Sequence, residues 1–293
     1  MNYDMLEDST CVIGESPICV EGKILVWVDA ESSQIYQLDL QSKKTHNIHV
    51  GLPVTAIAKI KKSGWLLVTK IGIYACDPNF QRYEYLGNPV KNNPKLRPND
   101  GVVSPAGDLW FGTMNQEELE APDGALFILH KETMQIQQLD CGFSVTNGIA
   151  FDVKNHCAYV SNMFQRKVYR YQLDTRWKAI QSKRGFVELP QGTGLPDGLK
   201  VDSKGRLYIC HWGAGIITVY QSDGQYVQSI PLPIRHATRC TFIDNGLLAL
   251  TTASYNMTEQ ELQRQPLSGT TLRIDLGADV SGTDFEFEAQ ISP

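Results

Sequence analysis

Short runs of alternating apolar and polar residues recur along the whole chain, and turn-forming residues separate them. Six runs follow a turn directly and carry the bulkiest side chains: GKILVWVD, SGWLLVTK, AGDLWFGTM, NHCAYVSNM, KGRLYICHW and NGLLALTTA. Each is followed, after a short loop, by a second alternating run, as in QIYQLDL and KVYRYQLD. Alternation with a period of two predicts β-strands, and the Gly, Asn-Gly and Asp-Gly turns between the runs predict hairpins.

The strand pairs repeat at a nearly constant interval. Equivalent positions in the six copies are Glu15, Val54, Asn99, Asn147, Asp197 and Thr238. Successive copies are 39, 45, 48, 50 and 41 residues apart, and further short segments flank each pair, which gives four strands per unit. Units of roughly 40–50 residues with four strands are typical of β-propeller blades. We therefore predict an all-β, six-bladed β-propeller with four antiparallel strands per blade, in a single domain over residues 1–293.

The alternative to this fold is a β-sandwich followed by a second β domain, which would also contain strand pairs. Six matched pairs at near-equal spacing favour the propeller. A closed ring needs its last blade to take a strand from the other end of the chain, and we expect MNYDML to pair beside FEFEA, residues 285–289. Helical periodicity is confined to a short stretch, EQELQRQ, at 259–265.

Composition and charge narrow the expected partners and location. The 293 residues include 27 Lys and Arg against 32 Asp and Glu, a net charge of −5, and no basic run, so nucleic acid is not an expected partner. The sequence shows neither a signal peptide nor an apolar run that could span a bilayer, so we expect a cytoplasmic protein with no membrane partner. The seven cysteines are scattered and odd in number, which indicates reduced thiols.

Polar residues recur where the inner strands of the predicted blades begin. In an antiparallel blade, the start of the first strand and the loop after the second lie on the same face of the disc. Glu15, Asn147 and Asp197 come from three blades and should meet at the channel mouth. Two carboxylates there would repel each other unless a cation lay between them, and carboxylate and amide oxygens suit Ca²⁺, Mg²⁺ or Mn²⁺. We therefore predict a divalent metal held by these three residues, with open positions for water and substrate.

Each of these residues also has a purely structural interpretation. Asn-Gly and Asp-Gly are common turn formers, Glu15 could be a solvated residue at a strand end, and Arg97 could be a surface charge. His211 and Trp212 fit a wall or a packing pair better than metal ligands, because no second histidine accompanies them. The repetition of polar residues at matching positions in several blades is what favours a site.

The motifs GESP, RPNDG followed by SPAGDLWFGTM, TNGIAFD and LPDGLKVDSKGRLY resemble those of the family of senescence marker protein (regucalcin), gluconolactonases and the luciferin-regenerating enzyme. The resemblance extends through nearly the whole chain in the same motif order. It implies a six-bladed propeller with one divalent metal in the channel, and hydrolysis of sugar-acid lactones. The metal ligands that it implies are Glu15, Asn147 and Asp197, and the substrate contacts are Arg97, Asn99 and Glu117.

These inferences together predict a gluconolactonase-like carboxylic ester hydrolase that acts on a sugar lactone. The metal, whose identity among Ca, Zn, Mn, Mg and Fe is open, is expected to polarise the lactone carbonyl, and Asp197 is expected to act as general base for water. The sequence departs from the family pattern at Pro98, where an aromatic residue is frequent, and at Asn162, where many relatives have aspartate. The alternatives are an organophosphate-type metal-dependent hydrolase and a calcium-binding regulatory propeller without turnover. We expect a monomer or a weak homo-oligomer.

Overall fold

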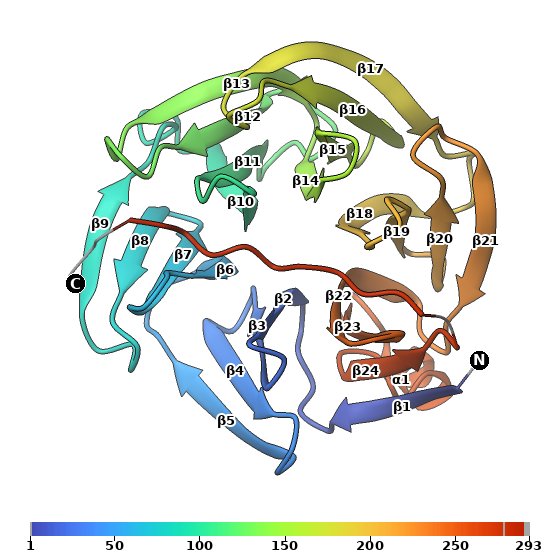
Figure 1. Ribbon diagram of the computed structural model, residues 1–293. Coiled ribbons are helices and arrows are strands. Elements are labelled where there is room, and N and C mark those ends of the chain that lie inside the picture. The colour runs from blue at the N-terminus through green and yellow to red at the C-terminus, as the bar shows by residue number, and fades with distance from the viewer. Residues whose placement is uncertain (1, 278, 290–293) are drawn as a thin grey trace.

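The computed structural model describes residues 2–277 and 279–289, and the described residues form a ring of six antiparallel sheets (Figure 1). Each sheet has four strands, and the sheets are arranged around a central axis like the blades of a fan. The predicted six-bladed β-propeller is therefore confirmed. The prediction of a single domain over 1–293 also covers residues 1, 278 and 290–293, which lie outside the described residues.

The blades are numbered here in chain order, and five of them consist of four consecutive strands. Blade 1 contains β2 (Gly14–Val20), β3 (Ile24–Asp29), β4 (Gln34–Asp39) and β5 (Lys44–His49). Blade 2 contains β6 (Val54–Lys59), β7 (Trp65–Thr69), β8 (Gly72–Cys76) and β9 (Tyr83–Gly87). Blade 3 contains β10 (Leu96–Val103), β11 (Leu109–Asn115), β12 (Gly124–Leu129) and β13 (Ile136–Phe143).

The other half of the ring repeats this order. Blade 4 contains β14 (Thr146–Asp152), β15 (Cys157–Asn162), β16 (Lys167–Leu173) and β17 (Ile180–Glu188). Blade 5 contains β18 (Leu195–Val201), β19 (Leu207–Trp212), β20 (Ile216–Tyr220) and β21 (Tyr226–Pro231). Blade 6 contains β22 (His236–Asp244), β23 (Leu247–Ala253), β24 (Thr271–Asp275) and the N-terminal strand β1 (Asn2–Glu7).

The ring closes where β1 joins the last blade. β1 pairs antiparallel with β24, with Tyr3 opposite Ile274. The expectation that the N-terminal segment contributes the closing strand is correct, but its expected partner is wrong, because FEFEA does not lie beside β1. Pairing with β24 gives blade 6 its fourth strand and leaves residues 279–289 to take another course.

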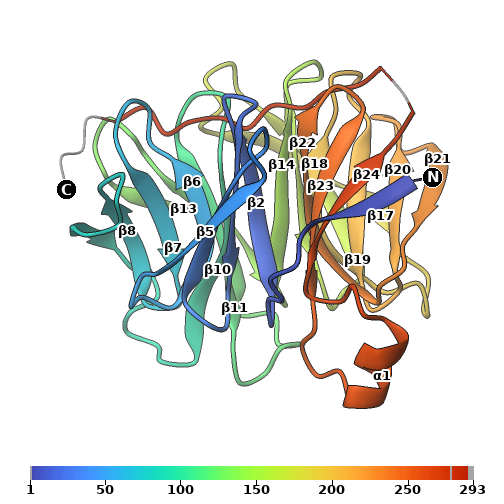
Figure 2. The same cartoon turned by 90° about the horizontal axis from the view of Figure 1, so that it is seen from below.

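Residues 279–289, called the strap here, cross the face of the disc opposite to the helix α1 (Figures 1 and 2). Within the strap, Asp284 accepts hydrogen bonds from Thr241 Oγ1 at 2.7 Å and from Cys19 N at 3.0 Å, and it pairs with Lys200. These three partners lie on the inner strands of three different blades. Farther along, the Phe287 amide donates to the carbonyl of Lys59 in blade 2 at 2.8 Å. The strap therefore ties opposite sides of the ring together.

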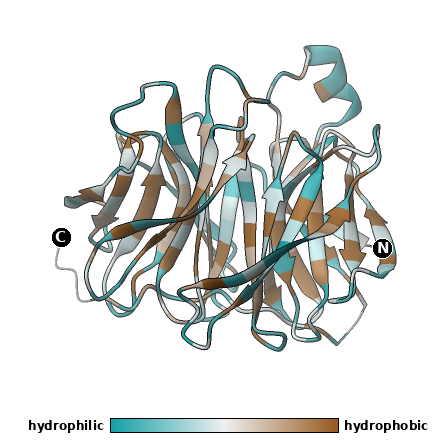
Figure 3. Cartoon of the chain, turned by 90° about the horizontal axis from the view of Figure 1, so that it is seen from above, coloured by the Kyte–Doolittle hydropathy of each residue, from teal (hydrophilic) through white to brown (hydrophobic). Residues whose placement is uncertain are grey.

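The core lies between the blades. Each pair of neighbouring blades shares one buried apolar cluster, such as Trp110, Ile128 and Phe151 between blades 3 and 4. In Figure 3 the strands carry apolar segments, whereas the loops and α1 are largely hydrophilic. Because both faces of each sheet meet a neighbour, the second strands of the blades are buried and largely apolar, as β7 and β11 are.

One short helix, α1 (Glu259–Arg264), occurs in the described part of the chain, within the predicted stretch. Thr258 caps it, and Glu261 reciprocates in a capping box. With six residues, α1 is too short to cross a membrane, and the described residues contain no longer helix. All seven cysteines are free, as predicted.

Candidate metal and substrate site

The inner strand of every blade carries an irregularity in its pairing near the channel mouth. In the four blades that supply the predicted site residues, the register between the first and second strands shifts between Glu15 and Ile18, Pro98 and Gly101, Asn147 and Ala150, and Pro196 and Leu199. A β-bulge redirects the side chains that it contains and leaves backbone groups unpaired. The predicted polar residues thus lie in or directly beside bulges, which point them away from the regular alternation of the strand.

The glycine that follows two of these residues has a specific role in the bulge. Gly148 has φ +51°, and a side chain on it would clash with the carbonyl oxygen of Asp197. A Cβ on Gly198 would lie 2.5 Å from Cβ of Arg239. The Asn-Gly and Asp-Gly pairs are therefore not hairpin turns in this fold. They let neighbouring inner strands approach closely enough for their polar side chains to meet.

Three carboxylates and one guanidinium lie together at the channel mouth, and we call them the mouth cluster: Glu15, Asp100, Asp197 and Arg239. Arg239 donates to both oxygens of Asp100, at 2.6 and 2.7 Å, and to the carbonyl of Ile149 at 3.0 Å. Asp100, Asp197 and Arg239 are buried, while Glu15 is partly accessible. One guanidinium neutralises only one carboxylate, so the cluster has two negative charges in excess when all three acids are ionised.

Burial and the excess negative charge raise the pKa values of both remaining acids, Glu15 and Asp197. Burial, and next the charge of Asp100, raise the pKa of Glu15 to about 8 against the opposing effect of Arg239. Burial and the charges of Glu15 and Asp100 also raise the pKa of Asp197 well above its ordinary value. Both pKa values are therefore raised by the same two causes, burial and neighbouring negative charge, and a bound cation would oppose both.

The oxygens at the mouth are arranged for a cation rather than for further donors. Asn147 donates from Nδ2 to Asp197 Oδ1, and its Oδ1 accepts from the Gly148 amide at 3.0 Å, which leaves a second lone pair on that oxygen. Glu15 Oε2 accepts from the Ser16 amide at 3.1 Å. Glu15 Oε1 and Asp197 Oδ2 accept no hydrogen bond from residues 2–277 or 279–289. Neither oxygen is a buried unpaired atom, so both reach the open space of the cavity, and carboxylate oxygens free in this way fit a hard divalent cation.

The candidate ligand set is of mixed type. Across the described ranges, no group of three or more His, Cys, Asp and Glu side chains has the arrangement of a metal site. The set of Glu15, Asn147 and Asp197 has two carboxylates and one amide, and Asp100 is occupied by Arg239. Its chemistry favours an oxygen-binding cation such as Ca²⁺, Mg²⁺ or Mn²⁺ over a thiol-binding one.

The three acids of the mouth cluster line a cavity of about 620 Å³, together with Tyr255 and Asn256 from the segment that leads to α1. The lining residues come from all six blades, as expected for residues at inner-strand starts and in the loops after second strands. The polar and aromatic lining residues include Glu15, Glu31, Lys70, Arg97, Asn99, Asp100, Asn147, Asp197, Trp212, Arg235 and His236. The volume lies within the range of pockets that bind drug-sized molecules.

The predicted substrate contacts have different positions. Arg97 and Asn99 line the cavity, and Asn99 Nδ2 donates to the carbonyl of Thr146 at 3.4 Å. Glu117 is exposed, lies 3.3 Å from Lys95 Nζ, and is not among the described residues that line the cavity. The substrate role of Glu117 stays a prediction, and in this structure it would require the loop after β11 to bring Glu117 inward.

Four further residues lie near the site. His211 and Trp212 have the packing and wall roles expected from the sequence, whereas His236 and Arg239 were not predicted. His211 is held by Thr193 O at 2.6 Å and Thr218 Oγ1 at 2.7 Å, so it has a packing role, and Trp212 lines the cavity as a wall. His236 stacks on Trp212 with ring centroids 4.2 Å apart, and burial lowers the pKa of His236 to about 4. The sequence analysis places residues 239–243, RCTFI, in a short apolar segment and gives no role to His236 or Arg239.

The contacts of Asn162 account for one departure from the family pattern, an amide where many relatives have aspartate. Its Oδ1 accepts from the amide and the hydroxyl of Ser144, at 2.9 and 2.7 Å, and the side chain is buried away from the cavity. At this position the amide joins two strand ends of blade 4 and does not contribute a charge to the site.

Comparisons with known proteins agree with the fold and the motifs. The sequence profile of the SMP-30/Gluconolactonase/LRE-like region matches residues 13–254. The chain is 29% identical to regucalcin of Xenopus laevis over 290 residues, covering 96% of both chains. It is 28% identical to the pentonolactonase XacC of Haloferax volcanii, covering 95% of this chain and 96% of that one. The crystal structure of a regucalcin from Agrobacterium tumefaciens, described as a calcium-binding protein, superposes with a TM-score of 0.90 at 24% identity, covering 98% and 97%. The chain belongs to the SMP-30/gluconolactonase/LRE-like family.

Proposed function

We propose that the protein is a lactonase that uses a divalent cation at the channel mouth to open the ring of a sugar-acid lactone. The observation that carries this proposal is the mouth cluster, in which the buried Asp197 and the partly accessible Glu15 each have a carboxylate oxygen without a donor and line a large cavity. A relative that matches nearly the whole chain is a pentonolactonase, which supports the reaction type and a lactone as substrate.

The residues that would hold the cation are Glu15, Asn147 and Asp197. When bound, a divalent cation supplies Lewis-acid polarisation of the ester carbonyl and stabilises negative charge on its oxygen. Arg239 holds Asp100 out of this ligand set, because both carboxylate oxygens of Asp100 are engaged by the guanidinium. Arg239 therefore fixes the number of protein ligands.

Asp197 is the residue best suited to transfer the proton. Its Oδ1 is fixed by the amide of Asn147, and its carboxylate lines the cavity, where it can accept a proton from water. In the proposed reaction, water adds to the carbonyl carbon and gives a proton to Asp197. The ring C–O bond then breaks, and the proton passes to the leaving alkoxide, which becomes a hydroxyl of the open-chain acid.

The remaining lining residues would orient the sugar. Arg97 and Asn99 present donors and an acceptor from the bulge at the start of β10, and Trp212 supplies a flat apolar wall across the cavity. A lactone placed with its carbonyl at the mouth cluster would contact both sides. The polar groups set its orientation, since each hydroxyl can satisfy only a neighbouring donor or acceptor.

A calcium-binding protein without turnover is the second candidate, favoured by the all-oxygen ligand set and by the description of the Agrobacterium relative. Measurements of acid release and of cation binding distinguish the lactonase from the calcium-binding protein without turnover. The full chain would be treated with a chelator, dialysed, and reloaded with Ca²⁺, Mg²⁺, Mn²⁺, Zn²⁺ or Fe²⁺ before assay with pentono- and hexonolactones.

If the protein is a lactonase, at least one cation should raise the rate of acid release by roughly two orders of magnitude or more over the rate of the chelated protein. Equal rates with and without cation would contradict the role of the metal. Cation binding by calorimetry without acid release from any lactone would favour the non-catalytic alternative.

A further inference from the structure

Arg97 is a cation in the cavity wall that lacks a counterion. Its Nη1 donates to the carbonyl of Pro98 at 3.0 Å and to Asn99 Oδ1 at 3.2 Å. Among the described residues, Nε and Nη2 have no hydrogen-bond partner, and no carboxylate lies within ion-pair distance of the guanidinium. Neither atom is a buried unpaired atom, so both reach open space. Nε and Nη2 together form one side of the guanidinium fork, the side that binds a carboxylate with two parallel hydrogen bonds.

The other two basic side chains that line the cavity, apart from His236, are already neutralised. Lys70 Nζ lies 2.9 Å from Glu31, and Arg235 Nη1 lies 3.1 Å from Glu261. Burial lowers the pKa of Arg97 to about 10, and the only acid that counteracts this effect is Glu31, which is already paired with Lys70. A desolvated cation without an anion is unfavourable, so the wall is incomplete until an anion binds to Arg97.

We propose that Arg97 binds a free carboxylate of the substrate, so that the lactone is one of a sugar diacid. This inference rests on the proposed function. Arg97 and the mouth cluster line the same cavity, and one molecule could place its ester carbonyl at the cluster and its second carboxylate at Arg97. A carboxylate is favoured over a phosphate because one unpaired guanidinium faces a cavity that also contains acids, whereas a dianion would need several free cations.

The test compares substrates that differ only in that group. Glucaro-1,4-lactone has a carboxylate at C6, glucono-1,4-lactone has a hydroxymethyl group there, and 6-phosphogluconolactone serves as the phosphate arm. For the metal-loaded full chain we expect kcat/KM at least 10-fold higher with the glucarolactone than with the gluconolactone. In Arg97→Met, kcat/KM should fall about 100-fold for the glucarolactone and about 5-fold for the gluconolactone. Arg97→Lys should recover part of the difference.

The matched control is Arg235→Met, which removes a cation of the same wall that already has its own acid, Glu261. It should change kcat/KM for both lactones by the same small factor. An equal loss for both lactones in Arg97→Met would overturn the proposal, because Arg97 would then recognise a group that the two substrates share. A wild-type preference for the phosphorylated lactone, lost in Arg97→Met, would overturn the assignment to a carboxylate.

A binding measurement separates this inference from the proposed function. If no lactone is opened, the proposed function fails, and calorimetry with gluconate and glucitol, of which only gluconate carries a carboxylate, then decides the inference. At least 10-fold tighter binding of gluconate by the wild-type protein, abolished in Arg97→Met, would support the carboxylate site. Equal affinity for the two compounds, or a preference for gluconate that Arg97→Met retains, would overturn it.

Discussion

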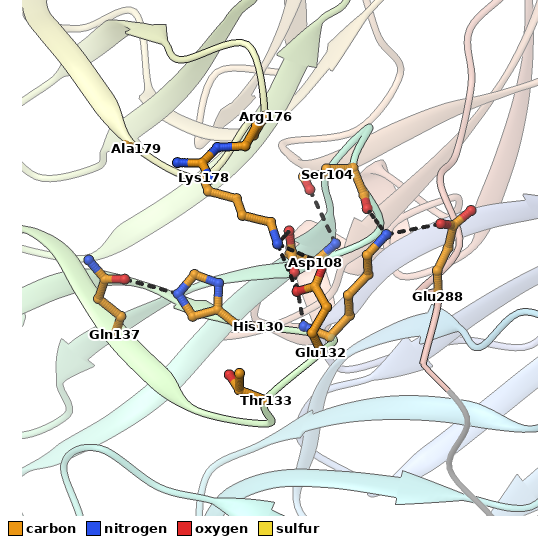
Figure 4. Close-up of polar contacts among 12 residues, drawn as sticks. Ser104, Asp108, His130, Glu132, Thr133, Gln137, Arg176, Lys178, Ala179 and Glu288 are labelled. Atoms are coloured by element: carbon orange, nitrogen blue, oxygen red, sulfur yellow. Dashed lines mark hydrogen bonds and ion pairs between the residues drawn. The ribbon is translucent and has the colours of Figure 1, made fainter.

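The mouth cluster and a second polar cluster on the opposite face contain the same number of carboxylates but differ in their cations. The second group, called the strap-face cluster here, consists of Asp108, Glu132, Glu288, Lys131 and Lys178 (Figure 4). Lys178 Nζ lies 2.7 Å from Glu132 and 3.8 Å from Asp108, and Glu288 lies 3.0 Å from Lys131 and 2.8 Å from Lys61. In the strap-face cluster every acid has a lysine, whereas in the mouth cluster only Asp100 has a cation.

The pKa values of the acids in the two clusters follow this difference in the number of neighbouring cations. The hydrogen bond from Lys178 lowers the pKa of Glu132, and those from Lys61 and Lys131 lower the pKa of Glu288, while the pKa values of Glu15 and Asp197 are raised. Asp108 is the intermediate case, since its burial raises its pKa although Lys178 opposes the effect. The comparison shows that a gathering of acids does not by itself indicate a site. The useful signal is a gathering of acids without matching cations.

The largest expected difference between the two regions is in activity. Asp197→Asn should lower kcat/KM for a sugar lactone by about 10³-fold, because an amide cannot take the proton from water. Asp108→Asn is the matched control, since Asp108 is also a buried aspartate next to an inner strand, and it should stay within about 3-fold of the wild-type protein. The rates are compared on variants whose folding is verified by circular dichroism. Similar losses in both variants would contradict the assignment of catalysis to the mouth.

The second difference is in stability. Arg239→Met leaves the carboxylate of Asp100 buried without a partner and should lower the free energy of unfolding by about 3–5 kcal/mol. Lys61→Met, which removes an exposed lysine whose acid Glu288 keeps Lys131, should cost about 1 kcal/mol or less. Urea denaturation measures both.

The double variant Arg239→Met/Asp100→Asn tests the cause. It should recover part of the loss, because the unpaired charge is then absent. If the double variant is no more stable than Arg239→Met alone, the loss does not come from the buried charge of Asp100.

The predictable parts of the fold are those that repeat in the sequence. Six strand pairs, bounded by turn residues, were enough to predict the six blades and the face on which Glu15, Asn147 and Asp197 meet. The course of FEFEA was predicted wrongly, because its alternation is also that of a blade strand. Single contacts, such as Phe287 with Ile60 and Asp284 with Lys200, decide its position, and the local pattern does not contain them.

The residues around the predicted ligands were harder to predict. Arg239 lies in an inner strand that also contains His236 and Asp244, so its charge did not stand out in the local pattern. Its partner Asp100 lies 139 positions away, so only the closed ring identifies the pair. The missing counterion of Arg97 was also invisible, because it depends on which acids in other blades are already paired.

The third expected difference is in how the stability of the metal-free protein depends on pH. Glu15 has a folded pKa of about 8 against an ordinary 4.5. Its stabilising contribution is therefore fully present below about pH 4.5 and is lost as the pH rises to 8, since unfolding then releases a proton. Asp197 acts in the same direction. We expect the Tm of chelated protein to fall by several degrees between pH 5 and 8 relative to Glu15→Gln, and a bound divalent cation to remove this difference.

Comparison with Glu15→Gln is needed because histidines act in the opposite direction. Burial lowers the pKa values of His211 and His236, so their contribution is lost as the pH falls below the ordinary value of 6.5. Differential scanning calorimetry at pH 5, 6, 7 and 8 gives the Tm values. A chelated wild-type protein whose Tm follows that of Glu15→Gln over this range would contradict the charge excess at the mouth.

The smallest expected effect comes from the strap-face cluster. Glu288 has a side chain that is 41% exposed, so its ion pairs with Lys61 and Lys131 are screened by solvent. Glu288→Gln should lower the free energy of unfolding by about 1 kcal/mol or less, and 0.5 M NaCl should reduce the difference further. The kcat/KM should not change, because no residue of the strap is among the described residues that line the cavity. A loss of activity in Glu288→Gln would mean that the strap influences the mouth through the inner strands, and the two regions could then no longer be treated as independent.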